Sequence, residues 1–376
     1  MWAMFVKEFR QLRRDRRTMA MMIVMPVLLL VVLGYAASFD VSSVPVAAAG
    51  PRAAAVAGLL PRPFDVVSTD AAAGQGWARD QLRDGHAAVA VVTGGSRLRV
   101  LIDGTQLFTA RTAVTALARL RGEGAALAGA AGGSAPAGAG AGSAAGPEVT
   151  ILYNPHLTTS YIMIPGLAGV VLVFIGTIIT SLGVVRERES GTLEQLAVMP
   201  LRPRDVFLGK LAPYFAVAAV DLAIVLAVGI AIFGVPFRGS PAVFALGALL
   251  FLFVTLGLGV LISSVSQNQG QAIQLAVMVM LPQVLLSGLI FPLGSIAAGV
   301  RWLSYLLPLT YFNEISRGVM LRAEPIGSLW QPLAYLAILG SVVVTAATLR
   351  FRAYLAPAPE RTARPRAGAS MAGQVS

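Results

Sequence analysis

The sequence contains no cysteine, two histidines (His86 and His156) and two lysines (Lys7 and Lys210). Without cysteine the chain can form neither a disulfide nor a thiolate metal site, and two histidines argue against an imidazole-based metal centre. The phosphate-binding loop GxxxxGK[ST] needs a lysine followed by serine or threonine, but Leu211 follows Lys210. HExxH and GxSxG are also absent. We therefore expect no cofactor, no ATP site and no enzymatic activity on this chain.

Charged residues are scarce as well, at 12% of 376 residues, whereas apolar residues make up 56%. A soluble domain carries about a quarter charged residues. The apolar residues form long blocks, and each block can cross a hydrocarbon core of about 30 Å as a helix. We predict an α-helical polytopic membrane protein with six transmembrane helices, at residues 19–39, 162–185, 212–234, 242–264, 272–291 and 332–349.

Residues 1–18 form a basic segment ahead of the first block. Its aromatic and aliphatic residues fall on one helical face and its cations on the other, which predicts an amphipathic helix on the cytoplasmic membrane surface. A positively charged anchor without an ordered helix is the alternative. A cleaved signal peptide fits less well, because its apolar region usually spans about 7–15 residues.

Residues 40–121 are polar and mixed, which predicts an inserted α/β domain. Strands are expected at 64–68, 87–93 and 97–103, and helices at 75–84 and 109–121. Residues 122–148 consist largely of glycine, alanine and serine, which is typical of a flexible linker.

The distribution of basic residues predicts the orientation. With the amino terminus inside, the inner segments hold 16 of the 29 lysines and arginines, as the positive-inside rule requires. Both termini, including the tail 351–376, are then cytoplasmic, and the α/β domain is extracytoplasmic. The net charge of +11 is spread over the span ends and the α/β segment, so we attribute it to topology rather than to nucleic-acid binding.

The inner segment 186–211 contains the most distinctive motif. Thr192 and Gln195 have the spacing of a capping box, and Pro200 should end the helix that begins there. A short charged helix of this kind could dock a soluble partner, or it could be a solvated loop that only sets topology. The residues of this candidate docking element are Arg186, Glu187, Arg188, Glu189, Gly191, Thr192, Leu193, Glu194 and Leu196.

Polar and helix-breaking residues interrupt two of the apolar blocks. Asp221 lies within the third block, where we expect a structural hydrogen bond rather than an ion relay, because a relay needs several such groups. Pro282 and Gln283 lie in the fifth block, followed by Gly288 and Pro292, and together they should weaken this helix near its outer end. Residues 301–322 are expected to form a re-entrant or interfacial outer helix.

The chain resembles the permeases of ABC-2-type transporters, in particular multidrug-type exporter subunits with a large loop after the first span. The resemblance depends on a series of motifs in order. They are VLIDG at 100–104, LYNP at 152–155, PG at 165–166, RERESGTLEQL at 186–196, GK at 209–210, PY at 213–214, FGVPFRGS at 233–240, LSGLIFP at 286–292, LPLTYF at 307–312 and RG at 317–318.

The resemblance implies that two permease subunits pair with two cytoplasmic ATP-binding subunits, which hold the ATP and magnesium. Residues 1–18 then resemble the connecting helix of these permeases, and residues 186–199 the element that contacts the ATPase. It also implies a bacterial inner-membrane location, and it leaves a periplasmic adaptor open as a further partner. The alanine-rich segment 45–60 departs from the family, because it lacks the acidic first strand expected there.

Our interpretation is a permease that exports an amphipathic drug, lipid or metabolite. Two alternatives remain. An ion-driven secondary transporter would need paired intramembrane charges or internal repeats, and we find a single acid and no repeat. A membrane-anchored scaffold or sensor would use the α/β domain to bind a ligand.

Overall fold

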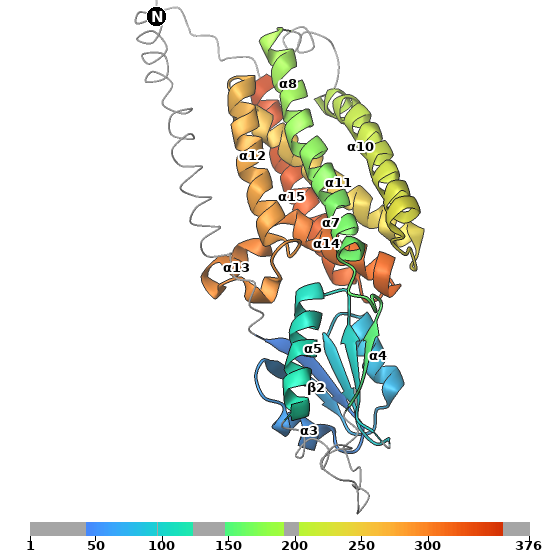
Figure 1. Cartoon of the computed structure of the whole chain (residues 1–376). Coiled ribbons are helices and arrows are strands. Elements are labelled where there is room, and N and C mark those ends of the chain that lie inside the picture. Colours follow the sequence, from blue (N-terminus) through green and yellow to red (C-terminus); the bar gives the residue numbers. More distant parts are fainter. Residues whose placement is uncertain (1–42, 96, 123–146, 192–202, 356–376) are drawn as a thin grey trace, which may run out of the picture.

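A helical bundle and an α/β body lie end to end in the chain (Figure 1). The computed structural model describes residues 43–95, 97–122, 147–191 and 203–355. The amphipathic helix expected at 1–18 and the first span expected at 19–39 lie outside these residues. So do the linker residues 123–146 and the tail residues 356–376, and these predictions are not tested.

The α/β body contains a five-stranded mixed sheet in the order β2-β1-β3-β4-β5. β1 pairs in parallel with β2 and β3, β3 is antiparallel to β4, and β4 is parallel to β5. The strands are β1 (Val44–Ala49), β2 (Phe64–Asp70), β3 (Val89–Val92), β4 (Arg99–Asp103) and β5 (Glu148–Leu152).

Helices cover both faces of this sheet. α3 (Ala53–Leu59) and α5 (Leu107–Gly122) bury Val56, Ala113 and other residues against one face. α4 (Gln75–Arg83) buries Ala78 and Leu82 against the other. Figure 1 shows α5 and α4 on opposite sides of the strands, so the body has three layers.

The sequence-based prediction missed two strands of the sheet. β1 has a paired strand on each side, and its alanines are fully buried. Alanine has a low strand propensity, so the segment did not resemble a strand, but its small side chain allows helices to pack closely on both faces. The second missed strand, β5, extends the body to Leu152, beyond the predicted boundary at 121 and into the predicted linker.

The bundle contains five described helices that are long and apolar enough to span a membrane. The first is continuous from Thr159 to Glu189 and consists of α7 (Thr159–Val173), the π-helical η1 (Phe174–Ile179) and α8 (Thr180–Glu189). The others are α10 (Pro203–Phe233), α11 (Pro241–Val265), α12 (Gln269–Leu286) and α15 (Trp330–Leu355). These helices agree with five of the six predicted blocks.

The block predicted at 212–234 agrees with the apolar stretch Ala212–Phe233, and α10 continues this helix back to Pro203. One predicted boundary is wrong. α12 ends at Leu286 rather than at 291, because Gly288 adopts a left-handed φ of 77° that terminates the helix. The chain then forms η2 (Leu293–Ser295) and α13 (Ala298–Ser304), which precede α14 (Pro308–Arg317) and η3 (Gly318–Arg322).

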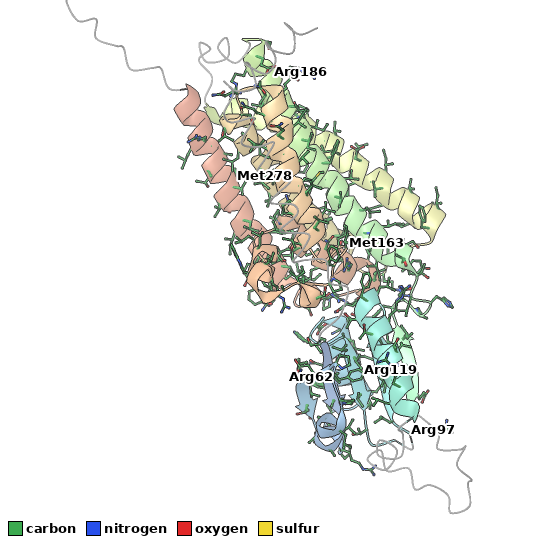
Figure 2. The ribbon with its side chains drawn as sticks, turned by 60° about the vertical axis from the view of Figure 1, so that its left-hand side comes forward. Arg62, Arg97, Arg119, Met163, Arg186 and Met278 are labelled. Atoms are coloured by element: carbon green, nitrogen blue, oxygen red, sulfur yellow. The ribbon has the colours of Figure 1, made fainter. Side chains whose placement is uncertain are left out.

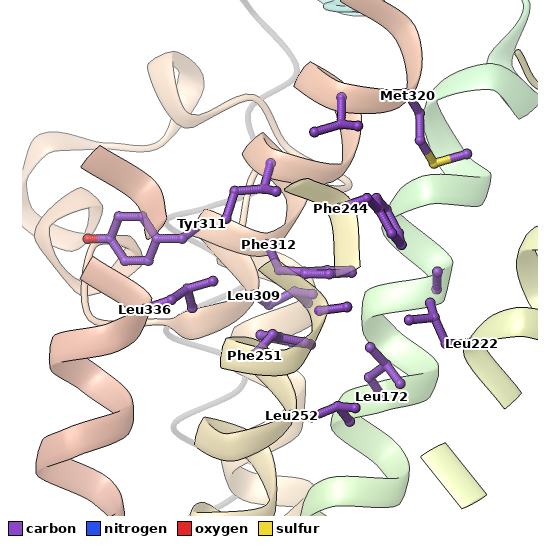
Figure 3. Packing of buried hydrophobic residues seen from close by; sticks show 14 of the residues in the cluster. Leu172, Leu222, Phe244, Phe251, Leu252, Leu309, Tyr311, Phe312, Met320 and Leu336 are labelled. Atoms are coloured by element: carbon purple, nitrogen blue, oxygen red, sulfur yellow. The ribbon is translucent and has the colours of Figure 1, made fainter. Parts of the chain in front are cut away.

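α14 is a short helix buried within the half of the bundle that is next to the α/β body. Phe312 and Leu309 of this helix are fully buried, and Phe312 stacks on Phe251 of α11 with ring centroids 4.5 Å apart (Figure 3). By contrast, Trp302 and Tyr305 at the end of α13 are exposed. The segment 301–322 thus contains an exposed part and a part buried in the bundle, and its re-entrant or interfacial placement stays a prediction.

Candidate functional site

The end of α8 that lies far from the α/β body is attached to the turn between α11 and α12. The guanidinium of Arg188 donates to the backbone carbonyls of Ser263 and Ser266 at the end of α11. These carbonyls lie at a helix C-terminus, which lacks intrahelical donors and carries partial negative charge. A cation there both caps α11 and links it to α8.

Glu189 makes the complementary contact with α12. Its Oε1 accepts a hydrogen bond of 3.1 Å from the backbone N–H of Gln269, and its Oε2 accepts one of 2.5 Å from Gln269 Nε2. The N-terminus of a helix carries partial positive charge, so it is stabilised by a nearby carboxylate, just as the C-terminus is stabilised by a nearby cation. Arg188 and Glu189 therefore hold α8 to both helices of the α11–α12 turn.

The other predicted docking residues fall into two groups. Arg186 is exposed, Glu187 is half-buried and Gly191 has a left-handed φ of 74° just after α8. Thr192, Leu193, Glu194 and Leu196 lie outside the described residues. Arg186 marks the end of the bundle opposite the α/β body (Figure 2).

The irregular backbone after the C-terminal end of α12 is supported by side chains of α14. Arg317 Nη2 donates to the carbonyl of Gly288 (3.1 Å), and Asn313 Nδ2 donates to Ser287 Oγ (3.0 Å). Irregular backbone at membrane depth needs such internal partners. The sequence identified the irregularity but not the side chains that support it.

The remaining predicted positions lie close to this end of α12 or on α10. Pro282 lies inside α12, Gln283 is fully buried, and Pro292 accepts a hydrogen bond from Ser295 Oγ (2.7 Å). Asp221 is half-buried on α10 and forms no hydrogen bond or ion pair with the part of the chain that the structure describes. The structural hydrogen bond expected for Asp221 therefore has no partner among these residues.

A buried charge cluster connects the α/β body to the bundle. Arg322 of η3 lies 2.8 Å from Glu324 and 3.5 Å from Asp103 at the end of β4. These three residues are at most 8% exposed, and Thr105 also donates to Asp103 (2.7 Å). Burial disfavours the charged form of Arg322, but the two carboxylates outweigh this effect and raise its pKa.

Neutral contacts support the same junction. Asn154 follows β5, and its Nδ2 donates to the carbonyls of Gly104 (3.3 Å) and Thr158 (3.0 Å), which links the end of the sheet to the start of α7. A side chain at Gly104 would meet the carbonyls of Leu152 and Asn154 at less than 3 Å, so this close approach requires glycine.

A cavity of about 510 Å³ lies at this junction, a size typical of small-molecule sites. Its lining comes from the α/β body on one side and from the outer ends of the spans and α14 on the other, and Figure 2 labels Met163 near the boundary. Among the described residues no group of His, Cys, Asp and Glu has the geometry of a metal site.

The sequence is similar to those of known membrane transporter proteins. The family model of the ABC-2 family transporter proteins matches residues 16–349. In Escherichia coli strain K12, the "Probable multidrug ABC transporter permease YbhR" is 34% identical over 53% of this chain and 54% of its own length. YbhS of the same strain, which has the same description, is 36% identical over 46% of each chain.

More distant proteins match as well. The "ABC transporter G family member 20" of Dictyostelium discoideum is 29% identical over 46% of this chain and 24% of its own length. The chain spans about half the length of the bacterial relatives that it matches. Because the family model covers most of the sequence, from the predicted first span to the end of the last predicted span, this chain belongs to the ABC-2 family of transporter proteins.

Proposed function

We propose that this chain is the membrane-spanning permease subunit of an ABC exporter, and that a separate cytoplasmic subunit binds and hydrolyses ATP. The attachment of α8 to the α11–α12 turn carries this proposal. A partner that pressed on the charged end of α8 would displace three helices together, because Arg188 and Glu189 couple that end to α11 and α12.

The exposed faces of the spans support pairing with a second permease subunit. In the most apolar stretch of α10 only 17% of the residues are buried, and in that of α12 only 28%. A second subunit would cover part of these faces, and the cargo would pass between the α7–α8 and α12 faces. An amphipathic cargo suits a passage lined by apolar helices.

Co-purification tests the partner. The tagged full-length chain, solubilised from its native membrane in mild detergent, should retain a P-loop ATPase that mass spectrometry identifies at a stoichiometry near one to one. A preparation that keeps its second permease copy but contains no nucleotide-binding protein would contradict the proposal.

The orientation follows from the same proposal: the end with Arg186 is cytoplasmic and the α/β body is extracytoplasmic. Because the chain has no cysteine, a single substitution introduces a unique thiol. In spheroplasts, Arg119→Cys should react with a membrane-impermeant maleimide, whereas Arg186→Cys should react only after permeabilisation. Both arginines are exposed on the protein surface, so a difference in labelling between the two variants reports the side of the membrane and not burial within the protein. The reverse labelling pattern would overturn the orientation.

A further inference from the structure

The junction cavity has one apolar and one polar side. Phe108 of α5, Met163 of α7 and Leu289 and Leu293 after α12 lie on its apolar side. The polar side includes the α14 residues Glu314 and Arg317. Such a division suits a ligand with an apolar body and a polar head.

Glu314 is exposed on an otherwise buried helix. Its neighbours Asn313 and Ile315 are at most 2% exposed, whereas Glu314 is exposed and lines the cavity. Glu314 forms no hydrogen bond or ion pair with any residue that the structure describes. Arg317, one turn later, instead donates to the carbonyl of Gly288. The carboxylate is therefore available to a ligand.

The charges around the cavity favour a cation. Glu314, Arg317 and Arg322 line the cavity, and Asp103 and Glu324 pair with Arg322 behind it, so this group of three carboxylates and two guanidiniums carries one net negative charge. Arg322 is already engaged by Asp103 and Glu324, which leaves Glu314 as the acid without a partner. A carboxylate in a partly desolvated site attracts an organic cation strongly because water screens the charge poorly there.

We propose that this cavity binds the cationic head of an amphipathic organic amine, with Glu314 as its counter-ion and the apolar wall around its hydrocarbon part. The proposal rests on the proposed export function, because it names the chemical class of the cargo. The site lies at the outer end of the bundle, where a cargo would be held before release.

The pH dependence of binding provides an internal check. The surrounding protein desolvates the Glu314 carboxyl and raises its pKa even though the side chain is exposed to the cavity, and the nearby Arg322 opposes this effect only in part. Binding of a permanently charged cation should therefore weaken as the pH falls through this raised pKa. Other titratable or charged groups also face this region, namely Arg317, Arg322, Tyr305, Glu324 and Asp103. The Glu314→Gln variant is therefore needed to measure their contribution to the pH dependence of binding.

The test measures binding of ethidium, which has a fixed positive charge, by fluorescence to the purified full-length chain in lipid nanodiscs, with empty nanodiscs as background. Glu314→Gln should weaken binding at least about tenfold and remove the pH dependence, while Glu314→Asp should keep most of the affinity. Glu148→Gln, at an exposed acid of β5, is the matched control and should bind normally. Leu293→Trp should block binding by filling the cavity.

Because this assay needs neither ATP nor the ATPase, it separates the two proposals. Ethidium binding that depends on Glu314 would support the cavity site even if ATP-driven transport were absent. Equal affinities of Glu314→Gln and the unsubstituted chain, or no ethidium signal above empty nanodiscs, would overturn the cavity site while leaving the export function standing.

Discussion

Replacing Glu189 with lysine is expected to reduce ATP-dependent transport at least about tenfold, with normal amounts of chain in the membrane. The carboxylate accepts two hydrogen bonds from Gln269, and a lysine can accept neither. It would also place a cation at the positive N-terminal end of α12. A tenfold effect corresponds to about 1.4 kcal/mol, which is within the range for loss of charge-assisted hydrogen bonds. Transport into inverted vesicles and retention of the ATP-binding subunit are the measurements.

Two control variants make this result specific. Glu189→Gln keeps one acceptor oxygen and should retain most transport. Arg186→Gln should also transport normally, because it removes an exposed charge of the same segment that makes no hydrogen bond to the described residues of the α11–α12 turn. If Glu189→Lys transported normally, the attachment of α8 to the turn would have no part in coupling.

Replacing Arg322 with methionine should destabilise the folded chain by about 3–5 kcal/mol, because Asp103 and Glu324 would remain buried without their cation. The loss should appear as a lower unfolding temperature in detergent and as faster proteolysis between the α/β body and α14. This effect should exceed that of most single substitutions.

Arg83→Met is the matched comparison for Arg322→Met. Arg83 also pairs with two carboxylates, those of Asp80 and Asp84, but its side chain is 36% exposed. An exposed pair contributes about 0–1 kcal/mol, so this variant should change stability little. The triple variant Arg322→Met, Asp103→Asn, Glu324→Gln should recover part of the loss, because no uncompensated charge remains buried. Equal melting of Arg322→Met and the unsubstituted chain would show that the cluster does not stabilise the junction.

The membrane helices could be predicted from the sequence because their signal is local. A block of about 20 apolar residues identifies a span whatever its neighbours are. The same holds for β2, β3 and β4, whose residues have high strand propensity, but not for β1, where tertiary pairing overrides the poor propensity of Ala47, Ala48 and Ala49.

The parts that could not be predicted depend on contacts between distant segments. The sequence placed Arg188 and Glu189 in the candidate docking element. Nothing in the motif indicated that these two side chains bind the α11–α12 turn. Asp103 and Arg322 are separated by most of the chain, and only folding brings them within 3.5 Å. Glu314 was not identified from the sequence, because its exposure to a cavity depends on the packing of α14.

The central claim is that this chain forms the passage and that a separate ATPase supplies the energy. Proteoliposomes containing the purified chain and the co-purified ATP-binding subunit, loaded with an amphipathic fluorescent cation, measure this directly. We expect transport that requires ATP and the ATP-binding subunit together and that survives an ionophore. Transport by the chain alone, driven by an imposed ion gradient without nucleotide, would contradict the account.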